Sequence, residues 1–108
     1  MVESSQATLD SVFHALSDST RRAILRDVSR KEKTVGEIAE PYRMSLAAVS
    51  KHLQVLEKAD LIQSEKRGNY RMVRLRAYNL RPAQKWLAWY ERFWNTRLDE
   101  LQKHLEGK

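Results

Sequence analysis

Apolar and polar residues recur along the chain with the period of α-helices. In the segments 9–17, 19–29 and 45–58, apolar residues return every three or four positions, which is the spacing of one helix face. Asp18 stands directly before the second segment and Ser45 opens the third, and both residue types are preferred as N-caps. The pattern therefore predicts a mainly helical chain.

The segment Ser45–Lys58 separates its faces most clearly. Its apolar residues are expected to face the core, namely Leu46, Val49, Leu53 and Leu56. Before it, Thr34-Val35-Gly36-Glu37 has the form of a capping box and predicts a short helix. This helix must end near Pro41, because proline cannot donate an intrahelical hydrogen bond. A short helix, a tight turn and a longer helix over residues 34–58 predict a helix-turn-helix.

Two β-strands are predicted after the helix-turn-helix. Residues 61–66 and 70–76 have strand-like composition and are separated by Arg67-Gly68-Asn69, which contains a turn-forming Gly-Asn pair. They form one hairpin, here called the wing, over about residues 61–76. The expected fold class is mainly α with this small β-hairpin. It is a winged helix-turn-helix of order α-α-α-α-β-β-α that fills residues 1–108 as a single domain.

A long last helix is predicted over about residues 82–105, with Pro82 at its first position. It carries nine large apolar residues, which are too many for one face of a small core: Trp86, Leu87, Trp89, Tyr90, Phe93, Trp94, Leu98, Leu101 and Leu105. One stripe is expected to close the core and another to meet a second copy of the chain. The aromatic residues among them are interpreted as core, with a small-molecule pocket as the alternative.

Charge is distributed unevenly along the chain. The formal net charge is +6, and residues 1–60 hold nine basic and nine acidic residues, whereas residues 61–108 hold eleven and five. Between Leu61 and Arg81, six basic residues accompany a single acidic one, Glu65. Such a basic patch suits a polyanionic partner, although a merely solvated surface has the same composition.

Several classes of protein are disfavoured by what the sequence lacks. It contains no cysteine, and therefore no disulfide and no thiolate metal site. It has neither a signal peptide nor an apolar run of about 18 residues, so a cytoplasmic protein without membrane contact is expected. It has no phosphate-binding loop, no nucleophile with a base and no paired carboxylates, which argues against an enzyme.

A helix that reads DNA needs an apolar face held by the domain and an outer face of small or hydrogen-bonding side chains. The segment Ser45–Lys58 meets both requirements. We therefore expect double-stranded DNA to be contacted by residues of the helix-turn-helix and the wing: Thr34, Ser45, Ala47, Ala48, Ser50, Lys51, His52, Gln54, Arg67, Asn69, Tyr70 and Arg71. For His52, a structural role is favoured over a phosphate contact.

Three blocks of the sequence resemble the ArsR family of bacterial winged-helix repressors. They begin at Ala15 with ALSDSTRRAIL, continue at Val35 with VGEIA, and end with MSLAAVSKHLQVLEKADLI over residues 44–62. Two positions depart from the family's pattern, because Ser19 replaces the usual proline and Asp60 replaces the usual glycine. Aspartate tolerates a left-handed backbone, so the turn at Asp60 is expected to be kept.

The resemblance implies a homodimeric transcriptional regulator whose two reading helices lie about one DNA turn apart, roughly 34–36 Å. Its interface would be formed by the first and last helices, here Leu9, Val12, Phe13, Trp86, Tyr90, Phe93, Trp94, Leu98 and Leu101. We expect a repressor that binds a pseudo-palindromic operator. The alternatives are a module that binds protein or RNA, and a general nucleic-acid binder.

The last helix resembles the branch of the family that lacks metal sites. ArsR-type metal sensors use cysteines near the third helix, or Asp and His ligands on the last helix. Here residues 34–42 contain neither cysteine nor histidine, and the last helix has one histidine, His104, beside Asp99 and Glu100. One histidine does not make a zinc site. No metal and no cofactor is expected, and any effector would be an unidentified small molecule.

Overall fold

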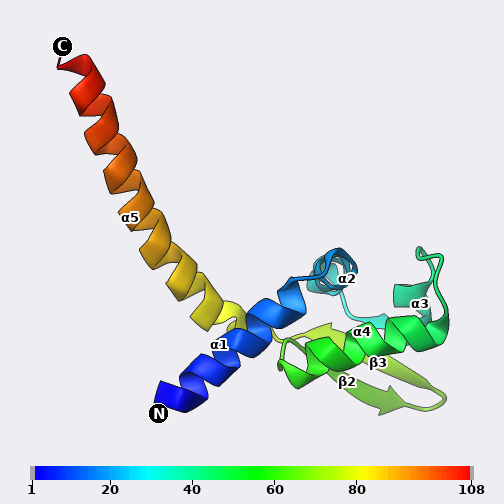
Figure 1. The fold of residues 1–108 in the computed structure, drawn as a ribbon. Coiled ribbons are helices and arrows are strands. Elements are labelled where there is room, and N and C mark those ends of the chain that lie inside the picture. Colours follow the sequence, from blue (N-terminus) through cyan, green and yellow to red (C-terminus); the bar gives the residue numbers. More distant parts are fainter. Residues whose placement is uncertain (1, 108) are drawn as a thin grey trace.

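A computed structural model describes residues 2–107 and the side chains of residues 6–107. The helices are α1 (Val2–Leu16), α2 (Ser19–Arg30), α3 (Val35–Ala39), α4 (Leu46–Lys58) and α5 (Arg81–Glu106), with a 3-10 turn, η1 (Ala77–Leu80), before α5. The strands are β1 (Lys33–Thr34), β2 (Ile62–Arg67) and β3 (Tyr70–Leu75). Figure 1 confirms the mainly helical winged helix-turn-helix that the sequence predicts. α1 begins at Val2, earlier than the segment 9–17 whose apolar pattern predicts it.

The predicted caps are present at the helix-turn-helix. The Thr34 hydroxyl accepts a hydrogen bond from the Glu37 backbone N–H at 3.1 Å, and the Glu37 carboxylate accepts one from the Thr34 N–H at 3.0 Å. At α4, the Ser45 hydroxyl accepts from the Ala48 N–H at 3.1 Å. Directly after α4, Asp60 has φ 59°, so its left-handed turn is confirmed. The side chains of Thr34 and Ser45 therefore define where α3 and α4 begin.

The sheet has one strand more than the sequence predicts. β3 lies in the middle and pairs antiparallel with β2 on one side and with β1 on the other. β1 was missed because its two residues, Lys33 and Thr34, are too short to show the alternation that identifies a strand. It joins the start of α3 to the wing, so the helix-turn-helix and the wing share one sheet.

The core lies where α1–α4 meet the sheet, and α1 to β3 are here called the body. Its fully buried side chains include Val12, Ile24, Ile38, Val49, Leu56, Leu61 and Val73. Val12 therefore packs inside one chain, and its prediction as an interface residue is wrong. Leu46 was predicted to face the core but is 59% exposed, because no neighbouring element covers the first residue of α4.

In contrast, α5 projects away from the body (Figure 1). Of its 26 residues only Ala83 is buried, and Trp86 meets Phe13 of α1 edge to face, with ring centroids 5.7 Å apart. The radius of gyration is 18.5 Å. A compact chain of this length would have about 13 Å. Most of α5 therefore lies outside the core of the chain.

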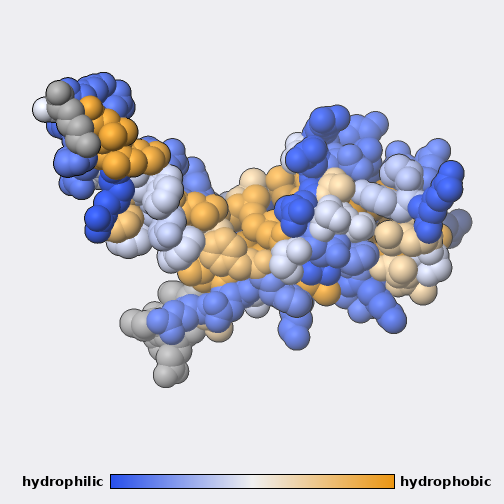
Figure 2. Space-filling model, turned by 45° about the horizontal axis from the view of Figure 1, so that its top comes forward, coloured by the Kyte–Doolittle hydropathy of each residue, from blue (hydrophilic) through white to orange (hydrophobic). Residues whose placement is uncertain are grey.

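The large apolar side chains of α5 form an uncovered face, here called the α5 face. They are 45 to 61% exposed: Trp86, Leu87, Trp89, Tyr90, Phe93, Trp94, Leu98, Leu101 and Leu105. Figure 2 shows apolar surface along α5 and where α5 meets the body. The prediction that one stripe of this helix closes the core holds only at its beginning. The interpretation of its aromatic residues as core is wrong for the single chain.

Candidate nucleic-acid interface

The outer side of α4 carries the small and polar side chains that the sequence assigns to DNA reading. Ala47 and Lys51 are exposed, and no neighbouring element covers them. On the side toward the wing, Ser50 and Gln54 line a cavity of about 230 Å³ together with Arg71 of β3. Ser50, Gln54 and Arg71 therefore face one hollow between α4 and the wing, and Ala47 and Lys51 lie on the exposed side of α4.

Two of the predicted contacts also act as helix caps. The oxygens of Ser45 and Thr34 accept backbone hydrogen bonds at the starts of α4 and α3. A hydroxyl that accepts in this way still has its own O–H to donate, for example to a phosphate oxygen. Ala48, which donates its backbone N–H to Ser45, is half-buried beside this cap.

His52 lies on the side of α4 that faces α2. Its Nδ1 atom is 3.3 Å from Nη1 of Arg21, and its side chain is 23% exposed. The expected structural role for His52 agrees with this position, which is away from Ala47 and Lys51. The sequence also predicts His52 as a DNA contact, and its contact with Arg21 of α2 gives that prediction no support.

The register of the two wing strands decides which basic side chains of the wing face α4. Lys66 pairs with Arg71, and Arg67 pairs with Tyr70. Residues directly opposite each other in an antiparallel pair project from the same face of the sheet, and successive residues alternate between faces. Arg71 and Ser64 line the cavity against α4. Lys66 therefore shares the face toward α4, whereas Arg67 and Tyr70 project from the opposite face.

Arg67 is held by two carboxylates of the protein. Its Nη1 lies 3.0 Å from Oε1 of Glu32, and its Nη2 lies 3.3 Å from Oε2 of Glu65. The hydrogen bond to Glu32 raises the pKa of Arg67. This guanidinium ties the wing to the segment before β1 and is already engaged within the protein.

Lys66 is a candidate that sequence reasoning missed. No ion pair joins Lys66 or Arg71 to another side chain of residues 6–107. The signal was available, because the two-residue alternation from Ile62 through Ser64 reaches Lys66 on the inward face of the strand. Lys66 and Arg71 are therefore the wing cations best placed beside α4.

The tip of the wing is a tight turn. Gly68 has φ +64°, a conformation that glycine adopts without strain, and its Cβ position is open on all sides. Asn69 and Tyr70 follow it and are both exposed. The predicted Gly-Asn turn is confirmed, and it presents Asn69 at the outer end of the hairpin.

Within the described part of the chain, no three His, Cys, Asp or Glu side chains gather where they could hold a metal ion. Within the same residues, no helix is both long and apolar enough to cross a membrane.

Known proteins are similar to this chain in sequence and in fold. A family model described as a helix-turn-helix domain matches residues 16–65. The transcriptional repressor SdpR of Bacillus subtilis is 33% identical over 79 residues, which cover 73% of this chain and 88% of SdpR. The crystal structure of an ArsR family transcriptional regulator is 34% identical, with a TM-score of 0.77, and the match covers 83% of this chain and 93% of that chain.

A more distant neighbour extends the likeness in fold. It is a homodimeric winged helix-turn-helix DNA-binding domain from Mycobacterium bovis, 23% identical with a TM-score of 0.65, and the match covers 82% of this chain and 83% of that chain. The fold, the basic wing and these relatives together define a DNA-binding transcriptional regulator. The chain belongs to the ArsR family of winged helix-turn-helix regulators. The relatives are named regulators and not enzymes.

Proposed function

We propose that this regulator is a homodimeric repressor that binds a pseudo-palindromic operator and needs no metal to do so. The observation that carries the proposal is the uncovered α5 face. Apolar surface of this extent on a small protein marks an interaction site. A second copy of the chain offers the same face, so two copies would cover each other in a two-fold arrangement.

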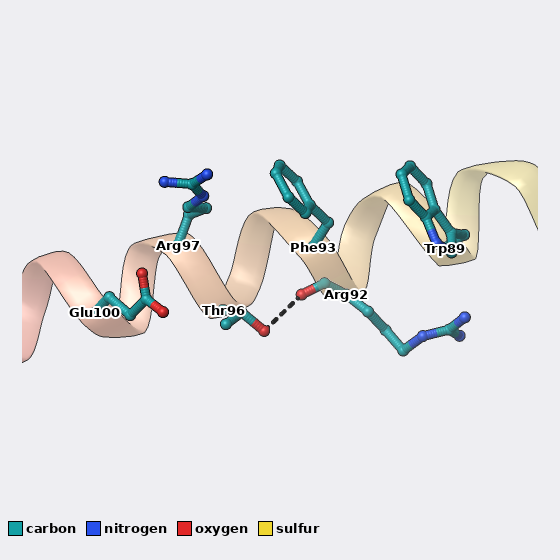
Figure 3. Close-up of a pocket in the computed structure, with 6 residues that line it drawn as sticks. All are labelled: Trp89, Arg92, Phe93, Thr96, Arg97 and Glu100. Carbon is teal, nitrogen blue, oxygen red and sulfur yellow. Dashed lines mark hydrogen bonds between the residues drawn. The ribbon is translucent and has the colours of Figure 1, made fainter.

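The middle of the α5 face carries a row of side chains beside an open hollow. The rings of Trp89 and Phe93 are stacked with centroids 6.0 Å apart, and the guanidinium of Arg97 lies 5.2 Å from the centroid of Phe93. Figure 3 shows these three side chains projecting in a row from one side of the helix. They border an open hollow of about 550 Å³ whose lining residues all belong to α5. One helix cannot enclose a cavity, so we assign the missing wall to the second copy.

Residues of α1 extend this surface. Leu9 and Phe13 are half-buried, and Phe13 touches Trp86 at the beginning of α5. α1 and α5 thus offer adjacent apolar side chains, in line with the interface that the family resemblance implies. The homodimeric neighbour from Mycobacterium bovis supports the same assembly.

A dimer supplies two reading helices to one duplex. In each copy, Ala47, Ser50, Lys51 and Gln54 would meet the major groove while Lys66 and Arg71 would meet the flanking backbone. The edge of α4 holds few groups able to make paired hydrogen bonds with a base, so methyl contacts and DNA shape would supply part of the specificity. Repression as the direction of control is supported by the name of SdpR.

Selection from random duplexes tests the proposal. The purified protein should enrich two inverted half-sites about one DNA turn apart, roughly 10 base pairs from centre to centre. A chelator or added zinc should leave the affinity unchanged, and the selected site placed in a promoter should lower transcription when the protein is present. Flat enrichment, a single half-site, or metal-dependent binding would each contradict a part of the proposal.

A further inference from the structure

Arg21, in the first turn of α2, is the buried charged side chain of the described residues, with 9% exposure. Its Nε donates to the carbonyl of Ala15 at 2.8 Å, and its Nη2 donates to the carbonyl of His14 at 3.0 Å. Both carbonyls belong to the last turn of α1, which has no following turn to donate to them. The His14 carbonyl also accepts from the backbone N–H and the hydroxyl of Ser17, at 3.1 and 2.6 Å. The last turn is also the negative end of the helix dipole, which favours a cation. Arg21 therefore caps α1.

The remaining arm of the same guanidinium reaches the reading helix. Nη1 of Arg21 lies 3.3 Å from Nδ1 of His52, which sits in the middle of α4. An arginine has only donors, so this contact is a hydrogen bond in the ring tautomer whose Nδ1 is free to accept. Among residues 6–107, the carboxylate paired with His52 is that of Asp18, whose Oδ2 is 3.8 Å from Nδ1. One planar group thus joins the end of α1 to the centre of α4.

The contacts of Arg21 with α1 and with His52 are here called the joint. The joint connects the proposed dimer helices to α4, and the proposed function requires both. α1 touches α5 through Phe13 and Trp86, and both helices belong to the proposed dimer interface. α4 reads DNA. A guanidinium presents its donors in a rigid plane, so contacts on its separate arms restrict the angle between the elements that they join. Arg21 and His52 thus link α4 to α1, one of the proposed dimer helices.

We propose that Arg21 and His52 are positioning residues that fix the angle of α4 to α1 and thereby set the half-site spacing the dimer accepts. The inference rests on the proposed binding of a homodimer to a two-fold operator. Moving one half-site by one base pair rotates it by about 34° around the DNA axis, since a turn holds 10–10.5 base pairs. A dimer with fixed reading helices cannot follow that rotation, whereas a dimer with a loosened joint can.

The test compares half-site spacing for the wild type and for His52→Leu, whose side chain is similar in size to that of histidine but has no hydrogen-bond acceptor. The full-length proteins are used in selection from random duplexes, followed by competition between sites that differ by one base pair in spacing. The wild type should prefer one spacing by about tenfold or more, a free-energy difference of about 1.4 kcal/mol. His52→Leu should select the same half-site sequence, with preferences between neighbouring spacings reduced to about threefold or less.

Two further variants separate positioning from general structure. In His52→Asn, the side-chain oxygen can accept from Arg21 in place of Nδ1, so the wild-type spacing should return. Arg21→Lys keeps the positive charge but replaces the planar fork with a single flexible group, and it should broaden the spacing as His52→Leu does. Circular dichroism shows whether each variant is folded. If His52→Leu does not fold, the comparison of Arg21→Lys with the wild type decides the question.

Several results would overturn the inference. A single unchanged spacing in the folded variants would show that the joint does not set it. His52→Leu could also lose a base preference within the half-site, or its slope of log affinity against log salt could fall by about one. Either result would show that His52 touches DNA itself. If the wild type selects no paired half-sites, the proposed operator fails first. If it selects them and His52→Leu behaves like the wild type, only the positioning role fails.

Discussion

The body buries its large apolar side chains, whereas α5 leaves its own exposed. In the body, side chains such as Ile24, Leu56 and Val73 are at most 1% exposed. In α5, side chains of similar size are 45 to 61% exposed, although they follow a helical period just as regular. Full burial of one such side chain is worth about 1.5–3 kcal/mol. The body has gained that free energy within one chain, whereas α5 can gain it only by meeting another surface.

The strongest way to break this comparison is to place charge on the α5 face. Phe93→Glu or Leu101→Glu should separate the dimer, because association would bury an unpaired carboxylate. Affinity for a paired operator should then fall about 10²–10⁴-fold, since the second half-site is no longer bound within the same complex. Analytical ultracentrifugation and gel shifts measure both effects. Asn95→Glu, an exposed position on the polar side of α5, is the matched control and should change neither.

Removing apolar volume from each region sharpens the comparison. Leu56→Ala in the body should lower the free energy of unfolding by about 2–5 kcal/mol, and the loss should be the same at every protein concentration. Leu101→Ala in α5 should lower Tm by an amount that shrinks as the protein concentration rises, because the residue stabilises an assembly. Thermal unfolding at two concentrations distinguishes these responses. Equal, concentration-independent shifts would mean that α5 is stabilised within its own chain.

The wing offers a prediction that involves the body alone. Arg71→Ala and Lys66→Ala should each reduce the slope of log affinity against log salt by about one, because each would remove one proposed phosphate contact. Arg67→Ala should leave the slope unchanged, since Glu32 and Glu65 already hold this side chain. Titrations at several salt concentrations measure the slopes. A reduced slope for Arg67→Ala would show that the guanidinium leaves its carboxylates and turns to DNA.

The smallest expected effect concerns acid, and it too separates the regions. The hydrogen bond from the Arg21 N–H lowers the pKa of Asp18 from 3.8, and that from the Thr34 N–H lowers the pKa of Glu37 from 4.5. Because both values fall on folding, these carboxylates stabilise the body fully above their unfolded-state pKa. That contribution is lost as the pH falls through the folded-state pKa.

Acid unfolding measures this contribution. Asp18→Asn and Glu37→Gln should lower Tm slightly near neutral pH and reduce the further fall of Tm toward about pH 3. α5 begins without a side-chain cap, so it has no corresponding carboxylate at its start. If the variant that carries both substitutions loses Tm in acid as steeply as the wild type, the acid sensitivity belongs to other groups.

The sequence predicted what depends on neighbours along the chain. The capping box at Thr34, the N-cap at Ser45 and the left-handed turn at Asp60 are local arrangements, and all three are present. Leu46 was misjudged because helical period alone does not tell where the covering elements end. β1 was missed because two residues carry no period.

The differences between the predicted and the observed surfaces have a similar origin. Arg67 looked as suitable as Arg71 in a list of basic residues, and only the strand register shows that they project from opposite faces of the sheet. The α5 face was partly assigned to the core because hydrophobicity indicates that a surface will be covered without indicating by which chain. Contacts that depend on distant segments, such as Arg21 with His52, had no signal in the pattern.

The projection of α5 has a consequence for cells that contain several related regulators. The side chains that would determine which chain this one pairs with lie on α5. Those that would determine which promoter it binds lie on α4 and the wing. Mutation can therefore change either choice without disturbing the other. After a gene duplication, a few substitutions along α5 would be enough to prevent mixed pairs, and each copy could then acquire its own target genes.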